Sequence, residues 1–193
     1  MSHSIWSAPA RHLLQQTASA DPTPGGGSVA AVSGALGVAL LQMAVVVTAA
    51  PQLDQPADRL AELRSEIEAA ADVDVQDFVA VMAAYRLPRT DDAQQAERAR
   101  AVEAALLAAT EHPLTLVGAL AETVTLSYEL ESLVKASIVS DVLAGRDIAR
   151  GAALAALHTV DINLAQLDRL ASPMAADLRA RRDAVLGRLE EEG

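Results

Sequence analysis

The 193-residue sequence contains no cysteine and only four aromatic residues, namely one Trp, two Tyr and one Phe. Without cysteine there can be neither a disulfide framework nor a thiolate zinc site. Because 51% of the residues are nonetheless hydrophobic, the core has to be built from Ala, Leu and Val. Such a composition suits closely packed helices better than a sheet, in which aromatic residues are enriched.

Basic residues are also scarce. The chain has 15 Lys and Arg against 26 Asp and Glu, which gives a formal net charge of −11. A chain of this charge offers no basic patch that could bind nucleic acid, so we expect no nucleic-acid partner. No basic segment followed by an apolar run opens the sequence, so we expect no signal peptide. Together with the absence of disulfides, this predicts a cytoplasmic protein.

Charge is missing altogether from residues 28–50. A run of this length reaches the roughly 20 apolar residues that span a bilayer. However, no Lys or Arg flanks either end, and there is no aromatic belt of the kind that membrane helices carry. Ala30, Gly34 and Gly37 would let neighbouring helices approach closely on one side. We therefore predict an Ala/Gly-rich central helix, buried all round within a bundle or a dimer interface, and no membrane span.

An irregular, glycine-rich turn precedes this run. Residues 22–27 read Pro-Thr-Pro-Gly-Gly-Gly, and Ser28 follows as a candidate N-cap. The free N–H groups of such a helix start favour a carboxylate, a phosphate or a carbonyl oxygen. Glycine also lets a ligand approach the backbone closely. The residues fit either a tight connection that caps a buried helix or a ligand-binding turn.

Hydrophobic periodicity and chain breakers predict helices in the rest of the chain. Besides 28–50 we expect helices over residues 5–19, 54–87, 91–110, 113–134, 140–170 and from 173 to the C-terminus, with Pro88 and Pro113 as breaks. No segment has the period of a strand, and no repeat or long linker is evident. The prediction is one all-α helical bundle over residues 1–193, which dimerises through its apolar central helix.

Carboxylates interrupt two apolar helix faces. The stripe on 54–87 contains Leu60, Leu63, Ile67, Ala71, Asp74, Phe78, Val81 and Tyr85. Asp74 thus occupies a core position, which is costly unless the carboxylate is paired. Asp72 and Asp77 fall off the stripe, and we predict that they are ordinary surface charges. Asp141 follows Ser140 at the start of a similar face. Asp74 is either a partner of a neighbouring helix end, a residue that a helix kink turns to solvent, or a functional group. Asp141 is either an N-cap, an acid–base group or a hydrogen-bond acceptor for a ligand.

The sequence gives little support for metal binding, for a serine nucleophile or for nucleotide binding. The four histidines lack metal-ligand spacing, so we expect no bound metal. There is no Gly-x-Ser-x-Gly nucleophile elbow, and the glycine run lacks the Gly-Lys-Ser/Thr ending of a phosphate-binding loop. Asn163 lies between Ile162 and Leu164, where a structural hydrogen bond is commoner than ligand binding.

Five segments, taken together, resemble the cyclodeaminase/cyclohydrolase family. They are residues 22–31, 84–88 (Ala-Tyr-Arg-Leu-Pro), 112–114 (His-Pro-Leu), 140–141 (Ser-Asp) and 161–164 (Asp-Ile-Asn-Leu). That family includes the cyclodeaminase domain of formiminotransferase-cyclodeaminase and bacterial methenyltetrahydrofolate cyclohydrolases. The resemblance extends from about residue 8 to 185. It implies an all-α homodimer that acts on a tetrahydrofolate derivative as substrate, with no metal and no covalently bound cofactor.

The resemblance also implies a set of site residues. Asp141 and Asp74 match acidic positions and would be catalytic, accepting a proton from water or passing it to a leaving nitrogen. The implied substrate-binding residues are Pro24, Gly25, Gly26, Gly27, Ser28, Ser140 and Asn163. Backbone N–H groups of residues 25–27 would stabilise oxygen that develops on the one-carbon unit. Because carboxylates on apolar faces need polar partners, we expect Asp74, Asp141 and the glycine turn to converge on one cavity, formed either by one chain or with a neighbouring subunit that completes it.

Two activities and one alternative follow from the resemblance. The enzyme would hydrolyse methenyltetrahydrofolate or deaminate formiminotetrahydrofolate. Family members carry a Gly-Lys-Lys-Tyr-type basic stretch after the second helix, where residues 49–53 of this chain read Ala-Ala-Pro-Gln-Leu. Folates are anionic, and basic residues would attract them. Because these residues are missing, the alternative is that the chain is a family member that binds a small molecule or a protein partner without turnover.

Overall fold

The computed structural model describes residues 4–191, and these residues form helices and contain no strand. The six α-helices are α1 (Ala10–Thr17), α2 (Gly26–Thr48), α3 (Asp54–Tyr85), α4 (Asp92–Leu133), α5 (Val139–Arg169) and α6 (Ala175–Glu191); three short 3₁₀ helices are η1 (Ile5–Ser7), η2 (Pro51–Leu53) and η3 (Ala136–Ile138). The predicted all-α class is therefore confirmed.

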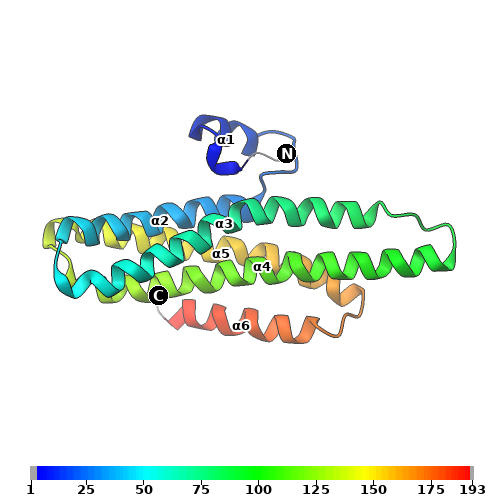
Figure 1. The fold of residues 1–193 in the computed structure, drawn as a ribbon. Helices are drawn as coiled ribbons and strands as arrows, with labels where there is room; N and C mark the ends of the chain where they lie inside the picture. The colour runs from blue at the N-terminus through cyan, green and yellow to red at the C-terminus, as the bar shows by residue number, and fades with distance from the viewer. Residues whose placement is uncertain (1–3, 192–193) are drawn as a thin grey trace.

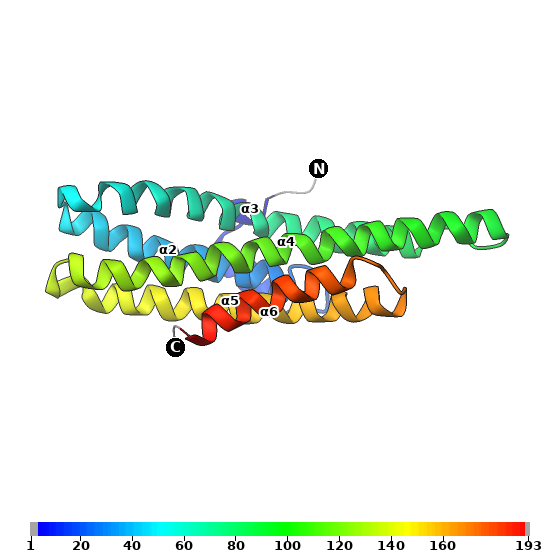
Figure 2. The ribbon, with the colours of Figure 1, turned by 90° about the horizontal axis from the view of Figure 1, so that it is seen from below.

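Helices α2 to α5 form an antiparallel bundle (Figures 1 and 2). Each helix runs opposite to the one before it, and α5 returns to pack against α2, which closes the bundle. Helix α6 lies along α4 and α5, and the N-terminal segment with η1 and α1 lies beside α2 and α3. Short connections between long amphipathic helices lead to this up-and-down arrangement.

The helices of the bundle differ in length, and this difference positions the site. Helix α2 has 23 residues and α4 has 42, so at 1.5 Å per residue they extend for about 35 and 60 Å. Helix α2 consequently begins partway along the bundle, and beyond its first residue α3, α4 and α5 continue without it (Figure 1). The glycine turn therefore delivers the start of α2 into the middle of the molecule.

Small residues bring α2 and α5 into close contact, as the sequence predicts. A Cβ atom on Gly37 would lie 2.9 Å from the carbonyl oxygen of Gly145, and one on Gly145 would lie 2.8 Å from the carbonyl oxygen of Gly37. Similarly, a Cβ on Gly34 would meet the side chain of Leu120 at 2.5 Å. At the contact between Gly37 and Gly145, the backbones of α2 and α5 approach so closely that no side chain fits between them.

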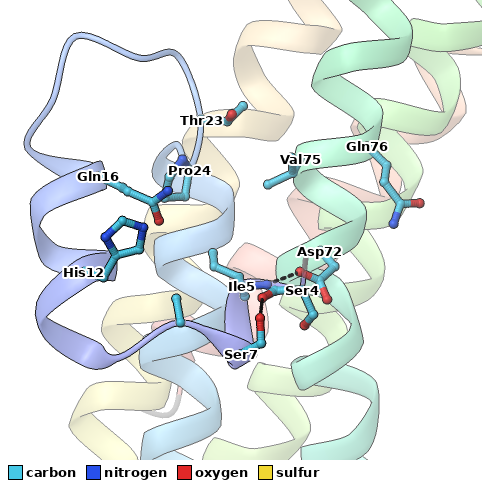
Figure 3. Close-up of a pocket in the computed structure, with 11 residues that line it drawn as sticks. Ser4, Ile5, Ser7, His12, Gln16, Thr23, Pro24, Asp72, Val75 and Gln76 are labelled. Carbon is cyan, nitrogen blue, oxygen red and sulfur yellow. Dashed lines mark hydrogen bonds between the residues drawn. The ribbon is translucent and has the colours of Figure 1, made fainter. Parts of the chain in front are cut away.

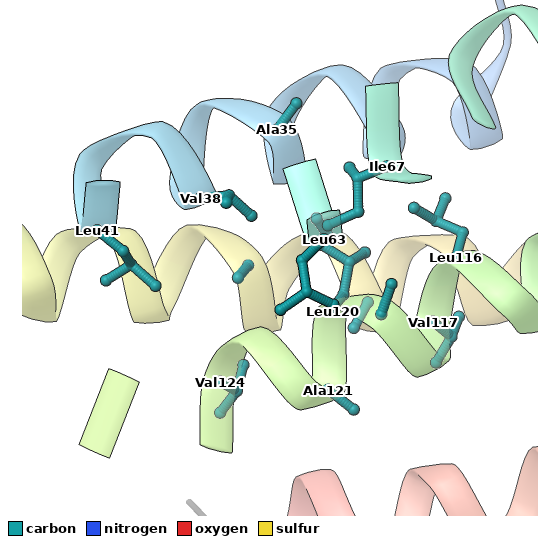
Figure 4. Packing of buried hydrophobic residues seen from close by; sticks show 14 of the residues in the cluster. Ala35, Val38, Leu41, Leu63, Ile67, Leu116, Val117, Leu120, Ala121 and Val124 are labelled. Carbon is teal, nitrogen blue, oxygen red and sulfur yellow. The ribbon is translucent and has the colours of Figure 1, made fainter. Parts of the chain in front are cut away.

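The hydrophobic core has two parts. The larger cluster joins α2, α3, α4 and α5 and includes Val38, Leu41, Leu63, Ile67 and Leu120 (Figure 4). The smaller cluster lies where α2 is absent and includes Leu106, Leu114, Val160, Leu164, Leu167 and Leu178. Both are built mainly from Ala, Leu and Val, as the composition predicts.

Within one chain, α2 is not buried all round, so burial within a bundle alone does not account for it, and burial in a dimer interface stays a prediction. Its inner face is buried, but Leu36, Met43, Val46 and Val47 lie exposed on the opposite face, with 59% of Leu36 and 74% of Val46 accessible to solvent. The reason is geometric, because only α3 and α5 flank α2 closely. By length and composition alone, α2 and α4 are both apolar enough to cross a membrane, and about half of each apolar window is buried in the fold.

The predicted helix break at Pro113 is also wrong, because α4 continues through it. A proline inside a helix has no N–H to donate to the carbonyl four residues earlier, which here is the carbonyl of Ala109. The side chain of Asn163 on α5 replaces this bond, since its Nδ2 donates to the oxygen of Ala109 at 2.6 Å. A neighbouring helix therefore satisfies the carbonyl that the proline leaves free.

Candidate functional site

A cavity of about 180 Å³ lies at the start of α2, where that helix leaves room between α3, α4 and α5. Its lining comprises Pro22, Thr23, Gly25, Gly26 and Gly27 from the turn, Asp74, Asp77, Phe78 and Val81 from α3, Ala109 from α4, and Thr159 and Asn163 from α5. Two carboxylates, one amide and the glycine turn thus meet in one place. Of the predicted site residues, the structure brings together Asp74, Asn163 and the three glycines.

Asp74 is fastened to the start of α2. Its Oδ2 accepts hydrogen bonds from the backbone N–H of Ser28 at 2.9 Å and from the Ser28 hydroxyl at 2.7 Å. Ser28 is fully buried, so the core position of Asp74 has the polar partner that it needs. A carboxylate at a helix N-terminus is also favoured by the helix dipole.

Gly27 is required by this contact. A Cβ atom at residue 27 would lie 2.0 Å from Oδ1 of Asp74, whereas one at Gly26 would meet nothing within 4 Å. The carboxylate therefore rests directly on the first turn of α2. Asp74 already accepts the hydrogen bond of the Ser28 N–H, whereas within residues 4–191 the N–H groups of Gly25, Gly26 and Gly27 make no hydrogen bond and are left for a ligand oxygen.

The sequence reasoning missed the roles of Asp77, which lines the cavity, and of His112, which is hydrogen-bonded to Asp77. Asp77 lies one turn after Asp74 on α3, its side chain is only 13% exposed, and its Oδ2 lies 2.7 Å from Nδ1 of His112 on α4. The predicted surface charge is thus wrong. The available signal was the spacing of three between Asp74 and Asp77, which places both carboxylates on the same side of a helix.

Burial raises the pKa of the Asp77 carboxyl above its usual value of 3.8. The hydrogen bond and the charge of His112 act in the opposite direction, and the neighbouring charge of Asp74 raises the pKa further. Because a carboxylate oxygen can only accept, His112 donates the Nδ1 proton in this contact. The cavity therefore holds a carboxyl group with increased proton affinity beside a histidine that is half exposed.

Asn163 forms part of the wall of the cavity. Its amide nitrogen is used by the carbonyl of Ala109, which agrees with the structural hydrogen bond that the sequence favours. Its amide oxygen remains as the group that a ligand could use.

A larger cavity of about 510 Å³ lies beside the first, between the N-terminal segment and α3. Thr23 lines both cavities, and Pro24 lines the larger one. Figure 3 shows His12, Gln16 and Pro24 on one side and Val75 and Gln76 on the other.

Asp72 holds the N-terminal segment on α3. Its Oδ1 accepts a hydrogen bond from the N–H of Ile5 at 2.7 Å (Figure 3). The indole N–H of Trp6 donates nearby to the carbonyl of Glu68 at 2.8 Å. The predicted role of Asp72 as an ordinary surface charge is therefore also wrong, because it anchors the segment that covers the larger cavity.

Ser140 and Asp141 lie away from both cavities, at the opposite end of α2. Gly37 packs against Gly145, and Asp141 lies one turn further along the antiparallel helix, so it is about 20 Å from Gly27 at 1.5 Å per residue. Asp141 is in the first turn of α5, where a carboxylate complements the helix dipole. Within one chain Asp141 does not join Asp74 and the glycine turn, and their convergence across a neighbouring subunit stays a prediction.

Among residues 4–191, no three His, Asp or Glu side chains are grouped so that they could hold a metal ion. The polar groups that line the smaller cavity are carboxyl, hydroxyl, amide and backbone groups, and the imidazole of His112 is hydrogen-bonded to one of the carboxyl groups.

Comparisons with known proteins place these features in context. A family model described as formiminotransferase-cyclodeaminase matches residues 9–182. The methenyltetrahydrofolate cyclohydrolase of Methylorubrum extorquens is 34% identical over an alignment of 137 residues. The match covers 67% of this chain and 66% of the relative, just under two thirds of that protein. The crystal structure of formiminotetrahydrofolate cyclodeaminase from Thermotoga maritima has a TM-score of 0.75 at 20% identity, covering 97% of this chain and 96% of that chain. This last similarity shows the fold.

Proposed function

The chain belongs to the formiminotransferase-cyclodeaminase family, and we propose that it is an enzyme of folate one-carbon metabolism that hydrolyses methenyltetrahydrofolate. Its relative from Methylorubrum extorquens is named for this activity. The observation that carries the proposal is the cavity at the start of α2, where two carboxylates face a glycine turn.

The charge of the cavity favours the cationic substrate. In methenyltetrahydrofolate the carbon that bridges N5 and N10 belongs to a positively charged amidinium group. The described lining of the cavity contains Asp74 and Asp77 and neither Lys nor Arg. Opposite charges attract strongly where water is partly excluded. This arrangement supports binding of the amidinium next to the carboxylates.

The size of the cavities supports a divided binding site. Cavities that take small molecules typically have about 300–1,000 Å³, so 180 Å³ is too small for a whole folate. The adjoining cavity of 510 Å³ shares Thr23 and brings the combined space into that range. We infer that the one-carbon bridge occupies the smaller cavity and that another part of the folate extends into the larger one.

Hydrolysis in this site needs three contributions from the chain. Water has to add to the amidinium carbon while a carboxylate takes one of its protons. The N–H groups of Gly26 and Gly27 are available to an oxygen that develops at this carbon. Asp74 keeps the turn in place through Ser28. Asp141 has no part in this proposal, because it lies at the far end of α2.

The direct test is the decay of methenyltetrahydrofolate absorbance with the purified protein, measured against the same solution without protein. The proposal predicts a rate that increases in proportion to protein concentration. A rate equal to the uncatalysed one would contradict it. Formiminotetrahydrofolate, assayed for ammonia release, distinguishes the cyclodeaminase activity.

A non-catalytic role is the second candidate, and the lysine-free residues 49–53 favour it. Binding of a folate without turnover would raise the melting temperature, because a ligand that binds only the folded state stabilises it. A rise in melting temperature with no catalysed decay would establish this alternative. Absence of both effects would remove folate from the function of the protein.

A further inference from the structure

We propose that Asp77 is the proton-transfer residue of the smaller cavity, and that His112 is the positioning residue that orients Asp77 and connects it to solvent. This inference rests on the proposed hydrolase function and assigns the proton-accepting group that the reaction needs. It concerns a pair of residues that the sequence pattern places on different helices, with Asp77 on α3 and His112 on α4.

The hydrogen bonds of the two carboxylates distinguish their roles. Asp74 uses Oδ2 for both bonds from Ser28, and its Oδ1 lies over the backbone of Gly27. Asp74 is thus tied to the start of α2. Asp77 uses Oδ2 for His112, and within residues 4–191 its Oδ1 makes no hydrogen bond. Since Asp77 lines the cavity, it has an oxygen free to accept a proton there.

The surroundings of Asp77 suit a group that both takes and returns a proton. The titratable groups that face it are Asp74 on its own helix and His112 on α4, while α2 and α5 present only glycines, Thr159 and Asn163. Burial raises the pKa of Asp77 toward the working pH, and the hydrogen bond from His112 limits this rise. An acid–base group works best when its pKa is near the operating pH.

The proton balance of the reaction can be followed through this pair. Water forms a C–O bond to the amidinium carbon, and one water proton passes to Asp77. Asp77 returns that proton to N5, and the C–N5 bond breaks with its electron pair going to N5. Asp77, ionised again, accepts the hydroxyl proton of the intermediate as the formyl C=O forms. A cation and water thus give a neutral formyl product and one proton. Asp77 releases this proton to solvent on the side of the half-exposed His112 and returns to the ionised state that accepts the Nδ1–H of His112.

The test compares substitutions in the pair with matched controls. Asp77→Asn keeps the shape and can still accept the bond from His112, but it cannot take a proton, so kcat should fall by about 10²–10⁴-fold with little change in KM. The exposed residues Asp147 and His158 supply controls, because Asp147→Asn and His158→Gln should keep the wild-type rate. Melting temperatures of all variants establish that they are folded.

The pH profile separates a catalytic pair from a structural one. The acidic limb of kcat/KM should report Asp77, which must be ionised to accept the proton. His112→Ala removes the bond that lowers the pKa of Asp77, so this limb should move to higher pH. His112→Gln, which can still donate a hydrogen bond, should move it less. A loss of packing alone would lower the rate without moving the limb.

Each result supports or overturns the inference. An Asp77→Asn enzyme with near wild-type kcat, or a His112→Ala enzyme with an unmoved acidic limb, would overturn it while the hydrolase function stands. If Asp77→Asn fails to fold, the acidic limbs of the two His112 variants still decide. A wild-type protein without turnover would overturn the proposed function and this inference together.

Discussion

The contact between Gly27 and Asp74 connects two parts of the site that are 47 positions apart in sequence. The carboxylate lies where a side chain of residue 27 would be, and it bonds to Ser28, the next residue. The third glycine of the run is therefore needed because the Asp74 carboxylate of α3 occupies the space that a side chain at residue 27 would fill. A change at residue 27 has to displace Asp74.

Gly27→Ala should destabilise the protein by about 1–3 kcal/mol, as overpacking of a buried contact does. Gly26→Ala is the matched control, because a Cβ there meets nothing within 4 Å and alanine is favoured over glycine in a helix by about 0.5–1 kcal/mol. Urea unfolding of both variants measures the difference. Equal stabilities of the two variants would show that Asp74 does not occupy the space next to Gly27.

Asp77 makes the stability of the protein depend on pH. A carboxyl group whose pKa is raised by folding stabilises the folded state fully below its unfolded pKa, here 3.8, and this contribution is lost as the pH rises through the folded pKa. Asparagine does not ionise, so the Asp77→Asn variant does not lose this stability as the pH rises. The melting temperature of the variant minus that of the wild type should therefore increase from pH 4 to pH 7.

Asp147→Asn, at an exposed position, is the control for this experiment and should show no such trend. A difference between Asp77→Asn and wild type that stays constant or decreases over the same pH range would show that folding does not raise the pKa of Asp77.

At the residue scale, periodicity identified Asp74 because a carboxylate stood in a stripe of apolar residues. The same stripe misled at Asp77, which lies beside it but faces a space that opens only because α2 begins partway along the bundle. Where a helix begins relative to its neighbours depends on tertiary packing, which a pattern along one helix does not contain. His112 likewise gains its role from a helix 35 residues away in sequence.

At the scale of the element, α4 shows how two helices share one set of hydrogen bonds. Local rules predict that the helix breaks at Pro113, because proline has no N–H to donate to the carbonyl four residues earlier. The break is avoided because Asn163 on α5 supplies the missing donor to Ala109. Such a compensation depends on the register of α4 against α5, so the sequence could place Pro113 and Asn163 but not pair them.

This pairing predicts a coupling between two substitutions. Asn163→Ala leaves the carbonyl of Ala109 without a partner and should cost about 1–3 kcal/mol. In a Pro113→Ala background, the new N–H of residue 113 can bond to that carbonyl, so Asn163→Ala should cost less. A double-mutant cycle by urea unfolding measures this coupling. Strictly additive effects would show that Asn163 does not replace the bond lost at Pro113.

At the scale of the whole molecule, composition and helix periodicity were sufficient for the all-α bundle. Small residues correctly indicated that a neighbouring helix approaches α2 closely, although not that this helix is α5. The surroundings of α2 were predicted less well. Complete lack of charge suggested burial on every side, but Leu36, Met43, Val46 and Val47 are exposed in the single chain. A sequence does not state whether an apolar face is covered by the same chain or by another.

We predict that a second copy of the chain covers this face. The exposed residues Leu36, Met43, Val46 and Val47 form a stripe that extends for about 17 Å along the charge-free helix α2. Exposed apolar surface of this extent is typical of an interface, and a stripe along one helix is self-complementary about a two-fold axis. The wild-type protein should therefore have twice the mass of the chain in light scattering at micromolar concentration.

Leu36→Glu places a charge in the stripe and should shift this mass toward that of one chain, because an unpaired charge is costly in an apolar interface. Val79→Glu is the matched control, since Val79 is an exposed apolar residue on α3 and lies outside the stripe. A monomeric wild type, or a dimer that both substitutions leave unchanged, would contradict the assignment of the α2 face. If Leu36→Glu also lowers turnover while the melting temperature of the separated chains stays high, the dimer contributes to the activity as well as to burial.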